Sequence, residues 1–200
     1  MKRDTRQAIL CTAKTLFNER GYDAVSTGDI SNALGISKGN LTYHFKRKED
    51  VMEAIVEEMH SHYVKPSAPT SLAALQALFI RVQKVTEENA FYFWHYTQLA
   101  QMSPRIQAIQ SEVVTDRISL FTSAFQTLQR DAILRAEEHP GHYAQLIQAI
   151  LLICTYWVPH SKLIRANGTE MNMLDCLWGV ISPMLTDQGI DAYNKIQPCD

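Results

Sequence analysis

The stretch TGDISNALGISKGNLTYHFKRK, residues 27–48, decides the fold of this 200-residue chain. Its apolar residues recur at helical spacing, and we expect two short helices to bury them: Ile30, Ala33, Leu34, Ile36, Leu41 and Phe45. Gly35 lies between these helices, where a tight turn needs a residue that tolerates positive φ. Two short helices joined in this way predict a helix-turn-helix.

The second helix of this pair has an unusual polar face. On pattern alone this face is either a solvated surface or a surface that binds a nucleic acid, and its residues suit the latter. Lysine, tyrosine and histidine side chains donate to phosphates, an asparagine amide can bond base edges, and a helix N-terminus can bind a phosphate. Gly39 and Thr42 are small enough for a close approach. Tyr43 is one residue from the buried face, so packing in the core is the alternative to a phosphate contact for this side chain. The expected contacts to double-stranded DNA are Thr27, Ser37, Lys38, Gly39, Asn40, Thr42, Tyr43, His44 and Lys48.

Charge is distributed unevenly along the chain. Residues 1–48 carry nine lysines and arginines against four acids, a net charge of +5, whereas the whole chain is −2 and the remainder therefore −7. A basic front on an acidic body indicates that only the front meets an anionic partner.

Composition excludes several classes of protein. With 46% hydrophobic and 20% charged residues, the chain has the composition of an ordinary globular protein. This composition excludes a disordered tail, a collagen-like chain and a disulfide scaffold. The four cysteines form no CxxC pair, so we expect reduced thiols and a cytoplasmic protein without a metal or cofactor. No signal peptide is apparent, the apolar segments look too short to span a membrane, and no catalytic motif occurs, so we expect no enzyme.

Helical periodicity without strand signals predicts an all-α fold. A first helix with Ile9, Leu16 and Phe17 inside should end at Gly21, and Ser26 should cap the second. The Pro/Ser segment 65–69 marks a boundary. We expect three short helices (1–47), a connecting helix (48–65) and a larger helical body (66–200). The helices expected in the last part cover 72–89, 90–102, 104–136, 143–165 and 170–187, with Pro159 and Pro183 kinking or ending the final pair.

The run from Arg6 to about Val56 resembles the DNA-binding domain of the TetR/AcrR family of bacterial transcriptional regulators. The matching segments are Ala8-Ile9-Leu10, Leu16-Phe17, Gly21-Tyr22-Asp23, Asp29-Ile30, Leu34-Gly35-Ile36-Ser37-Lys38-Gly39, Tyr43-His44-Phe45 and Lys48-Glu49-Asp50. The resemblance implies that residues 1–47 form a DNA-binding domain and residues 66–200 an effector-binding and dimerisation domain. It also implies a homodimer whose third helices enter successive major grooves of a palindromic operator, and a body that binds a small-molecule effector. Gly28, in the first turn of the second helix, departs from the family pattern.

Residues 91–96 are six consecutive ring residues, and two interpretations of them stay open. They can fill the core between neighbouring helices, or some of them can line the effector cavity that the resemblance implies. Both can also hold, with one face packing and the other lining the cavity. Such an apolar pocket with few polar groups suits a flat or aromatic molecule. The expected ligand contacts are Phe91, Trp94, His95, Gln98 and Leu99, facing Arg117, Phe121 and Phe125.

The last two helices are too apolar all round for surface helices. Either they are buried within the monomer or, as the resemblance implies, two such pairs form a four-helix dimer interface. The expected interface residues are Ile150, Ile153, Trp157, Leu174, Leu177, Trp178 and Ile181.

The sequence thus predicts a ligand-responsive DNA-binding regulator, most simply a repressor. The alternative is a helical binding or sequestration protein whose N-terminal module no longer binds DNA. The intact polar face from Lys38 to His44 favours the regulator.

Overall fold

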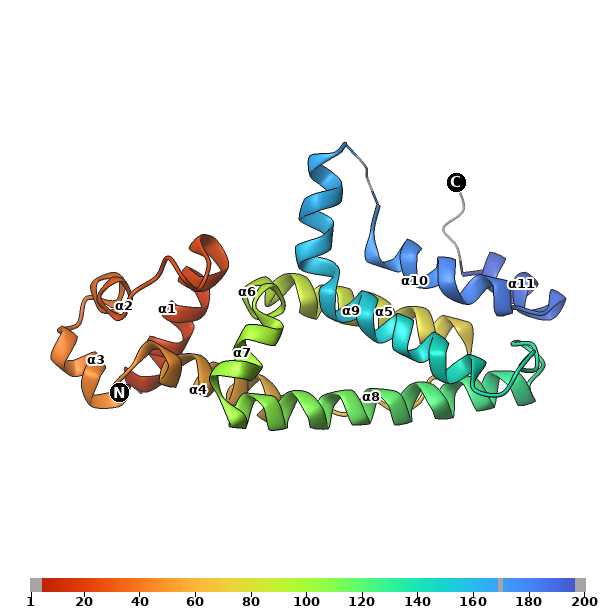
Figure 1. Cartoon of the computed structure of the whole chain (residues 1–200), viewed down its shortest axis with the longest axis horizontal. Coiled ribbons are helices and arrows are strands. Elements are labelled where there is room, and N and C mark those ends of the chain that lie inside the picture. Colours follow the sequence, from red (N-terminus) through yellow and green to blue (C-terminus); the bar gives the residue numbers. More distant parts are fainter. Residues whose placement is uncertain (1–4, 169–170, 197–200) are drawn as a thin grey trace. The chain divides into compact units, whose positions relative to one another are not determined.

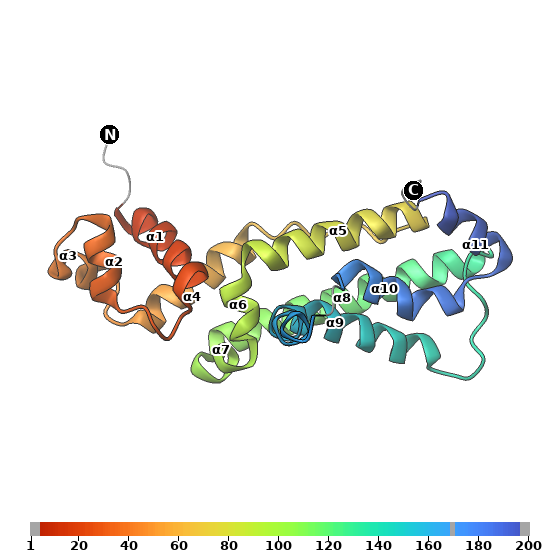
Figure 2. The same cartoon turned by 90° about the horizontal axis from the view of Figure 1, so that it is seen from above.

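The computed structural model describes residues 5–168 and 171–196, and in these residues it is all-α, as expected (Figures 1 and 2). Its helices are α1 (Thr5–Arg20), α2 (Thr27–Leu34), α3 (Lys38–His44), α4 (Lys48–Ser61), α5 (Leu72–Glu88), α6 (Ala90–Trp94), α7 (Tyr96–Met102), α8 (Pro104–Arg130), α9 (His142–Ala166), α10 (Met173–Ile181) and α11 (Asp187–Asn194), with a 3₁₀ turn, η1 (Ser182–Met184). One isolated antiparallel bridge joins Leu134 to Leu185.

The boundaries of the first helices follow from their capping residues. Gly21 ends α1 at φ +83°, and the Ser26 hydroxyl accepts a hydrogen bond from the backbone N–H of Asp29, whose carboxylate accepts one from the Ser26 N–H. This reciprocal arrangement is a capping box, which fixes the start of α2. Gly35 ends α2 at φ +71°, in the left-handed region that glycine tolerates. The expected helix-turn-helix is confirmed.

The chain divides into two compact units, each made of two separate segments of the sequence. The first unit holds the described residues up to Val64 together with Asn89–Ser111, and the second holds Lys65–Glu88 with the described residues from Glu112 onward. The expected boundary at 65–69 lies in a non-helical segment between α4 and α5. The sequence pattern did not indicate that residues 89–111 join the N-terminal helices.

The second unit is organised around aromatic rings from α5, α8, α9 and α10. Phe79 lies 6.1 Å from Phe121 and 6.0 Å from Trp178, ring centre to ring centre, and Phe125 lies 5.4 Å from Tyr143. α9 and α10 run side by side and antiparallel (Figure 1). Residues that the sequence pattern marks as apolar therefore come together in one core.

Three expected helix boundaries differ from the structure. The expected helix 90–102 is broken at His95 into α6 and α7, and the adjacent rings of Phe91, Tyr92 and Phe93 are all buried within α6. α8 ends at Arg130, followed by Ala132 at φ +55°. The expected helix 170–187 consists of α10 and η1, and α11 was not anticipated.

The two prolines act differently. Pro159 lies inside α9, which continues to Ala166, so it does not end the helix. Pro183 lies in η1, directly after α10 has ended at Ile181. A proline in the first turn of a helix loses no hydrogen bond, which explains why η1 accommodates it.

In the part of the chain that the structure describes, α9 is the one helix whose length and composition would allow it to cross a membrane. The sequence pattern made this segment look too short, but the helix has 25 residues, so length does not exclude a span. Its residues Leu146, Ile150 and Trp157 belong to the core of the second unit, and the core helix of a globular protein passes the same test. The burial of α9 therefore accounts for its composition.

Candidate DNA-binding interface

The polar face of α3 points outward. Leu41 is fully buried and Phe45, at the C-terminal cap, is nearly so, and these two side chains anchor the helix on the core of the first unit. The residues on the opposite side are exposed: Lys38, Gly39, Asn40, Thr42 and Tyr43. A seven-residue helix anchored on one side presents the other side to a partner as a rigid surface.

Tyr43 is the most exposed large side chain of this face, with 87% of its surface accessible. Its ring stands edge-on to that of His44, 5.2 Å away between ring centres, and His44 is half-buried. The alternative core role of Tyr43 is therefore excluded, and its hydroxyl is available to a partner.

Two hydroxyl groups of α3 are engaged within the helix. The Ser37 hydroxyl accepts the backbone N–H of Asn40 at 3.2 Å, and the Thr42 hydroxyl donates to the Lys38 carbonyl at 2.9 Å. Ser37 thus caps the helix, and its own proton can still be donated. The Asn40 side chain is exposed, as base contact requires.

In α2 the structure corrects one burial expectation and qualifies two others. Ile30 is fully buried as expected, but Ala33 is exposed and Leu34 half-buried; Ile36, in the turn after α2, is also half-buried. Helical spacing alone cannot show how wide the covered face of so short a helix is. Thr27, at the start of α2, is half-buried.

Lys48 is held differently from a free surface lysine. Its ammonium donates to the backbone carbonyl of Tyr22 at 2.9 Å and lies 4.1 Å from the centre of the Tyr22 ring. The sequence pattern placed Lys48 on the DNA-binding face and indicated no role for Tyr22. The family resemblance contained both residues, but no spacing rule connects positions 26 residues apart.

Other basic groups surround α3. From the sequence alone they contributed only to the net charge of the first 48 residues. The Arg6 guanidinium lies 5.3 Å from the centre of the Phe45 ring, and Lys46 and Arg47 are exposed in the turn after α3. Arg47 pairs with Asp50 at 3.1 Å in the first turn of α4. Lys46 is therefore a further candidate for phosphate contact.

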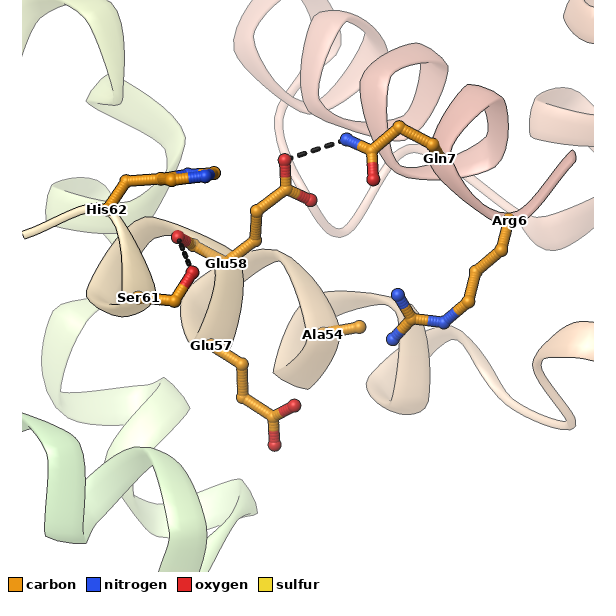
Figure 3. A pocket seen from close by; sticks show the side chains of 7 residues that line it. All are labelled: Arg6, Gln7, Ala54, Glu57, Glu58, Ser61 and His62. Carbon is orange, nitrogen blue, oxygen red and sulfur yellow. Dashed lines mark hydrogen bonds between the residues drawn. The ribbon is translucent and has the colours of Figure 1, made fainter. Parts of the chain in front are cut away.

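A shallow polar pocket of about 600 Å³ lies between α1 and α4 in the same unit (Figure 3). The Gln7 amide donates to the Glu58 carboxylate at 2.7 Å, the Ser61 hydroxyl donates to the Glu58 carbonyl at 2.8 Å, and Glu57 pairs with Arg105. Both carboxylates in the pocket thus already have partners, and the Gln7–Glu58 hydrogen bond joins α1 to α4.

The aromatic run packs against the DNA-binding helices. The Phe91 ring lies 6.0 Å from that of Phe17 in α1, and the Phe91 backbone N–H donates to the Asn18 side-chain oxygen at 3.2 Å. The His95 ring lies 6.0 Å from the Tyr22 ring. Phe91, Tyr92 and Phe93 are buried, as the core interpretation expects. Trp94 is exposed, and His95 and Tyr96 are half-buried.

The expected ligand residues are divided between the two units. Phe91 and Leu99 are buried in the first unit, Trp94 is 43% exposed, and His95 bonds Gln98 at 2.9 Å. The remaining three belong to the second unit: Arg117, which is half-buried, and Phe121 and Phe125, which are in its core.

Five of the seven expected interface residues are buried in the core of their own unit: Ile150, Trp157, Leu177, Trp178 and Ile181. For these side chains the structure shows the alternative, burial within the monomer, because α5 and α8 cover the face that the apolar pattern marks. Ile153 and Leu174 are partly buried.

The outer faces of α9 and α10 form an apolar groove of about 620 Å³, in which Leu152 is 59% exposed. The other lining residues are Ile153, Tyr156, Trp157, His160, Met171, Asp175, Cys176, Gly179 and Val180.

The described cysteines are free thiols, with Cys11 exposed and Cys154 buried; Cys199 lies outside the described residues. Burial raises the pKa of Cys154 to about 11, so its thiol stays protonated at neutral pH. Within residues 5–168 and 171–196, no cluster of three potential metal ligands occurs.

Two sequence models of known families match the chain. The first, bacterial regulatory proteins of the tetR family, matches residues 9–55, and the second, a bacterial transcriptional repressor of the same name, matches residues 55–193. The chain belongs to the TetR family. The first match covers α2 and α3 in full, so the exposed face of α3 described above belongs to the TetR-family helix-turn-helix.

Individual relatives agree with this assignment. The regulator AcrR of Shigella flexneri is 34% identical over 43% of this chain and 44% of its own length, and the repressor BepR of Brucella suis is 24% identical over 74% and 77%. The chain thus spans less than half of AcrR. A TetR-family regulator from Marinobacter aquaeolei has the same fold, with a TM-score of 0.81 and 21% identity over 99% of this chain and all of its own.

Proposed function

We propose that the chain is a ligand-responsive transcriptional repressor that binds a palindromic operator as a homodimer in the cytoplasm, and not an enzyme. The observation that carries this proposal is the exposed polar face of α3, anchored by Leu41 and Phe45, in a chain of the TetR family. A sequestration protein has no need for such a face.

On DNA, α3 enters the major groove. Asn40 contacts a base edge, because its amide presents both a donor and an acceptor. Lys38, Tyr43, His44 and Lys48 contact phosphates, which set register and affinity for all sequences alike. Gly39 and Thr42 allow close approach, and Thr27 and Ser37 add hydroxyl donors at the starts of α2 and α3.

Two copies of α3 must lie about 34 Å apart to reach successive major grooves, which a twofold dimer provides. We place the dimer interface at the groove on α9 and α10, through Leu152, Ile153, Tyr156 and Val180. Its support is the exposure of apolar side chains there, since contiguous apolar patches on a protein surface mark interaction sites. Gly179 lets the partner helices approach closely.

The effector is a small apolar, ring-containing molecule. A solved structure of the same fold is a complex of SmeT with triclosan, at 16% identity and a TM-score of 0.63 over 99% of this chain and all of the other. Of the expected effector contacts, the five that lie in the first unit form the proposed site: Phe91, Trp94, His95, Gln98 and Leu99. Arg117, Phe121 and Phe125 belong to the second unit and are not assigned to it. Because Phe91 packs on α1, a ligand that displaces this segment changes the DNA-binding helices and shifts the population between two arrangements.

The test is binding of the purified protein to duplex DNA that flanks its gene, measured by fluorescence anisotropy against random DNA of equal length. We expect specific binding at an inverted repeat, and release by compounds that quench Trp94. Compounds that bind while no duplex is bound specifically would favour the sequestration protein instead.

A further inference from the structure

Tyr22, in the turn after α1, contacts Lys48 at the start of α4. The Lys48 ammonium lies 4.1 Å from the centre of the Tyr22 ring, within the distance at which a ring face attracts a cation. The same ammonium donates to the Tyr22 carbonyl at 2.9 Å. Tyr22 thus contacts the Lys48 ammonium both through its backbone carbonyl and through its ring.

This contact leaves the lysine able to bind an anion. An ammonium has three donors, and the Tyr22 carbonyl takes one of them. Lys48 is half-buried and begins α4, three residues after the cap of α3 at Phe45. A lysine on a flexible four-carbon stem normally loses rotamer freedom when it binds a phosphate. Here the stem is already ordered.

The Tyr22 ring is itself fixed. It is 3% exposed, and the Phe17 ring stands 5.2 Å away and the His95 ring 6.0 Å away, both edge-on. Burial, with Glu49 and Asp23 nearby, raises the pKa of the Tyr22 phenol, which keeps it neutral. Among the described residues its hydroxyl has no hydrogen-bond partner, so packing, not hydrogen bonding, holds the ring.

We propose that Tyr22 is a positioning residue for DNA binding, which holds the Lys48 ammonium in place for a backbone phosphate. The proposal rests on the DNA-binding function proposed above. It assigns Tyr22, a buried residue outside the helix-turn-helix, a part in operator affinity through Lys48.

The experiment is a double-mutant cycle with Tyr22→Leu and Lys48→Met on the full chain, with binding to the flanking duplex measured between 50 and 200 mM salt. Lys48→Met should flatten the dependence of log affinity on log salt by roughly 0.9 for each phosphate that is no longer neutralised. Tyr22→Leu should weaken binding roughly three- to tenfold and flatten the same slope in part. In the Lys48→Met background, Tyr22→Leu should change neither quantity.

Three further variants separate positioning from folding. Tyr22→Phe keeps the ring face and should restore the wild-type slope, and Tyr22→Met replaces Tyr22→Leu if the latter lowers the folded fraction. Ile30→Ala removes core volume from α2 and should lower thermal stability while the salt slope stays unchanged.

Equal losses from Tyr22→Leu in both backgrounds, or a wild-type salt slope in Tyr22→Leu, would show that the ring only packs and would overturn the proposal. A wild-type protein that binds no flanking duplex above random DNA would overturn the DNA-binding function instead.

Discussion

Gly189 in α11 lies where no larger residue fits, and Gly189→Ala should destabilise the second unit. A Cβ added there falls well inside contact distance of the Ile133 carbonyl oxygen, and lies 3.1 and 3.2 Å from two carbons of Leu185. The obstacle is backbone, which cannot rotate away as a side chain can. The substitution therefore forces α11 away from the segment that follows α8.

The cost follows from the hydrogen bonds at this contact. The Thr186 N–H donates to the Ile133 carbonyl at 3.1 Å, its hydroxyl donates to the Ala132 carbonyl at 2.6 Å, and the Gly189 N–H donates to that hydroxyl at 3.0 Å. The third of these bonds is the N-terminal cap within α11 and moves with the helix. Displacing α11 therefore loses the first two bonds, which costs about 2 kcal/mol at about 1 kcal/mol each. Alanine returns about 1 kcal/mol of helix propensity, so the net loss is about 1 kcal/mol.

Thermal unfolding of the purified variant, followed by circular dichroism, measures this loss. At roughly 2–4 °C per kcal/mol for a chain of this size, the melting temperature should fall by about 2–4 °C. Gly28→Ala is the control, because its added Cβ meets the Ser26 hydroxyl at an ordinary 3.4 Å. A melting temperature for Gly189→Ala at or above that of the wild type would refute the close approach.

Three other predictions concern DNA reading, assembly and pH. Asn40→Ala should reduce discrimination at one operator position by about 1–3 kcal/mol, and equal losses on specific and random DNA would refute base contact. Leu152→Glu should convert the dimer to monomers in light scattering and abolish operator binding, whereas an unchanged mass would place the interface elsewhere. Burial, with Glu137 nearby, raises the pKa of Tyr143 to about 12, so the unfolded state loses this proton first and the free energy of unfolding should fall as pH rises from about 10 to 12. Tyr143→Phe should remove that part of the pH dependence in urea titrations.

The helix-turn-helix could be predicted from sequence because local chemistry determines it. Ser26 and Asp29 cap α2 within four residues, and Gly35 needs a left-handed conformation that few other residues tolerate. The outward face of α3 follows once Leu41 and Phe45 are assigned to the core. These features depend on residues that are close together in the chain, so a pattern over about twenty residues is enough to predict them.

The body could not be predicted to the same depth, because its decisive contacts are distant in sequence. The apolar pattern of Leu177 and Ile181 is the same whether α5 of the same chain or a second subunit covers them. The ring-rich run 91–96 gives no sequence signal for the break at His95, and α11 depends on the fit of Gly189 against Ile133. None of these contact partners lies within the short stretch of sequence from which a helix is predicted.

The bond between Phe91 and Asn18, with the Phe17–Phe91 ring pair, has a consequence for engineering. A biosensor that transplants this operator specificity onto another regulator cannot be made with one crossover after Val64, because that graft leaves Phe17 facing a foreign segment. The transferable piece is bipartite and consists of the N-terminal helices and residues 89–111. Chimeras with two matched crossovers should retain a stable DNA-binding part, and libraries recombined at a single point should lose it.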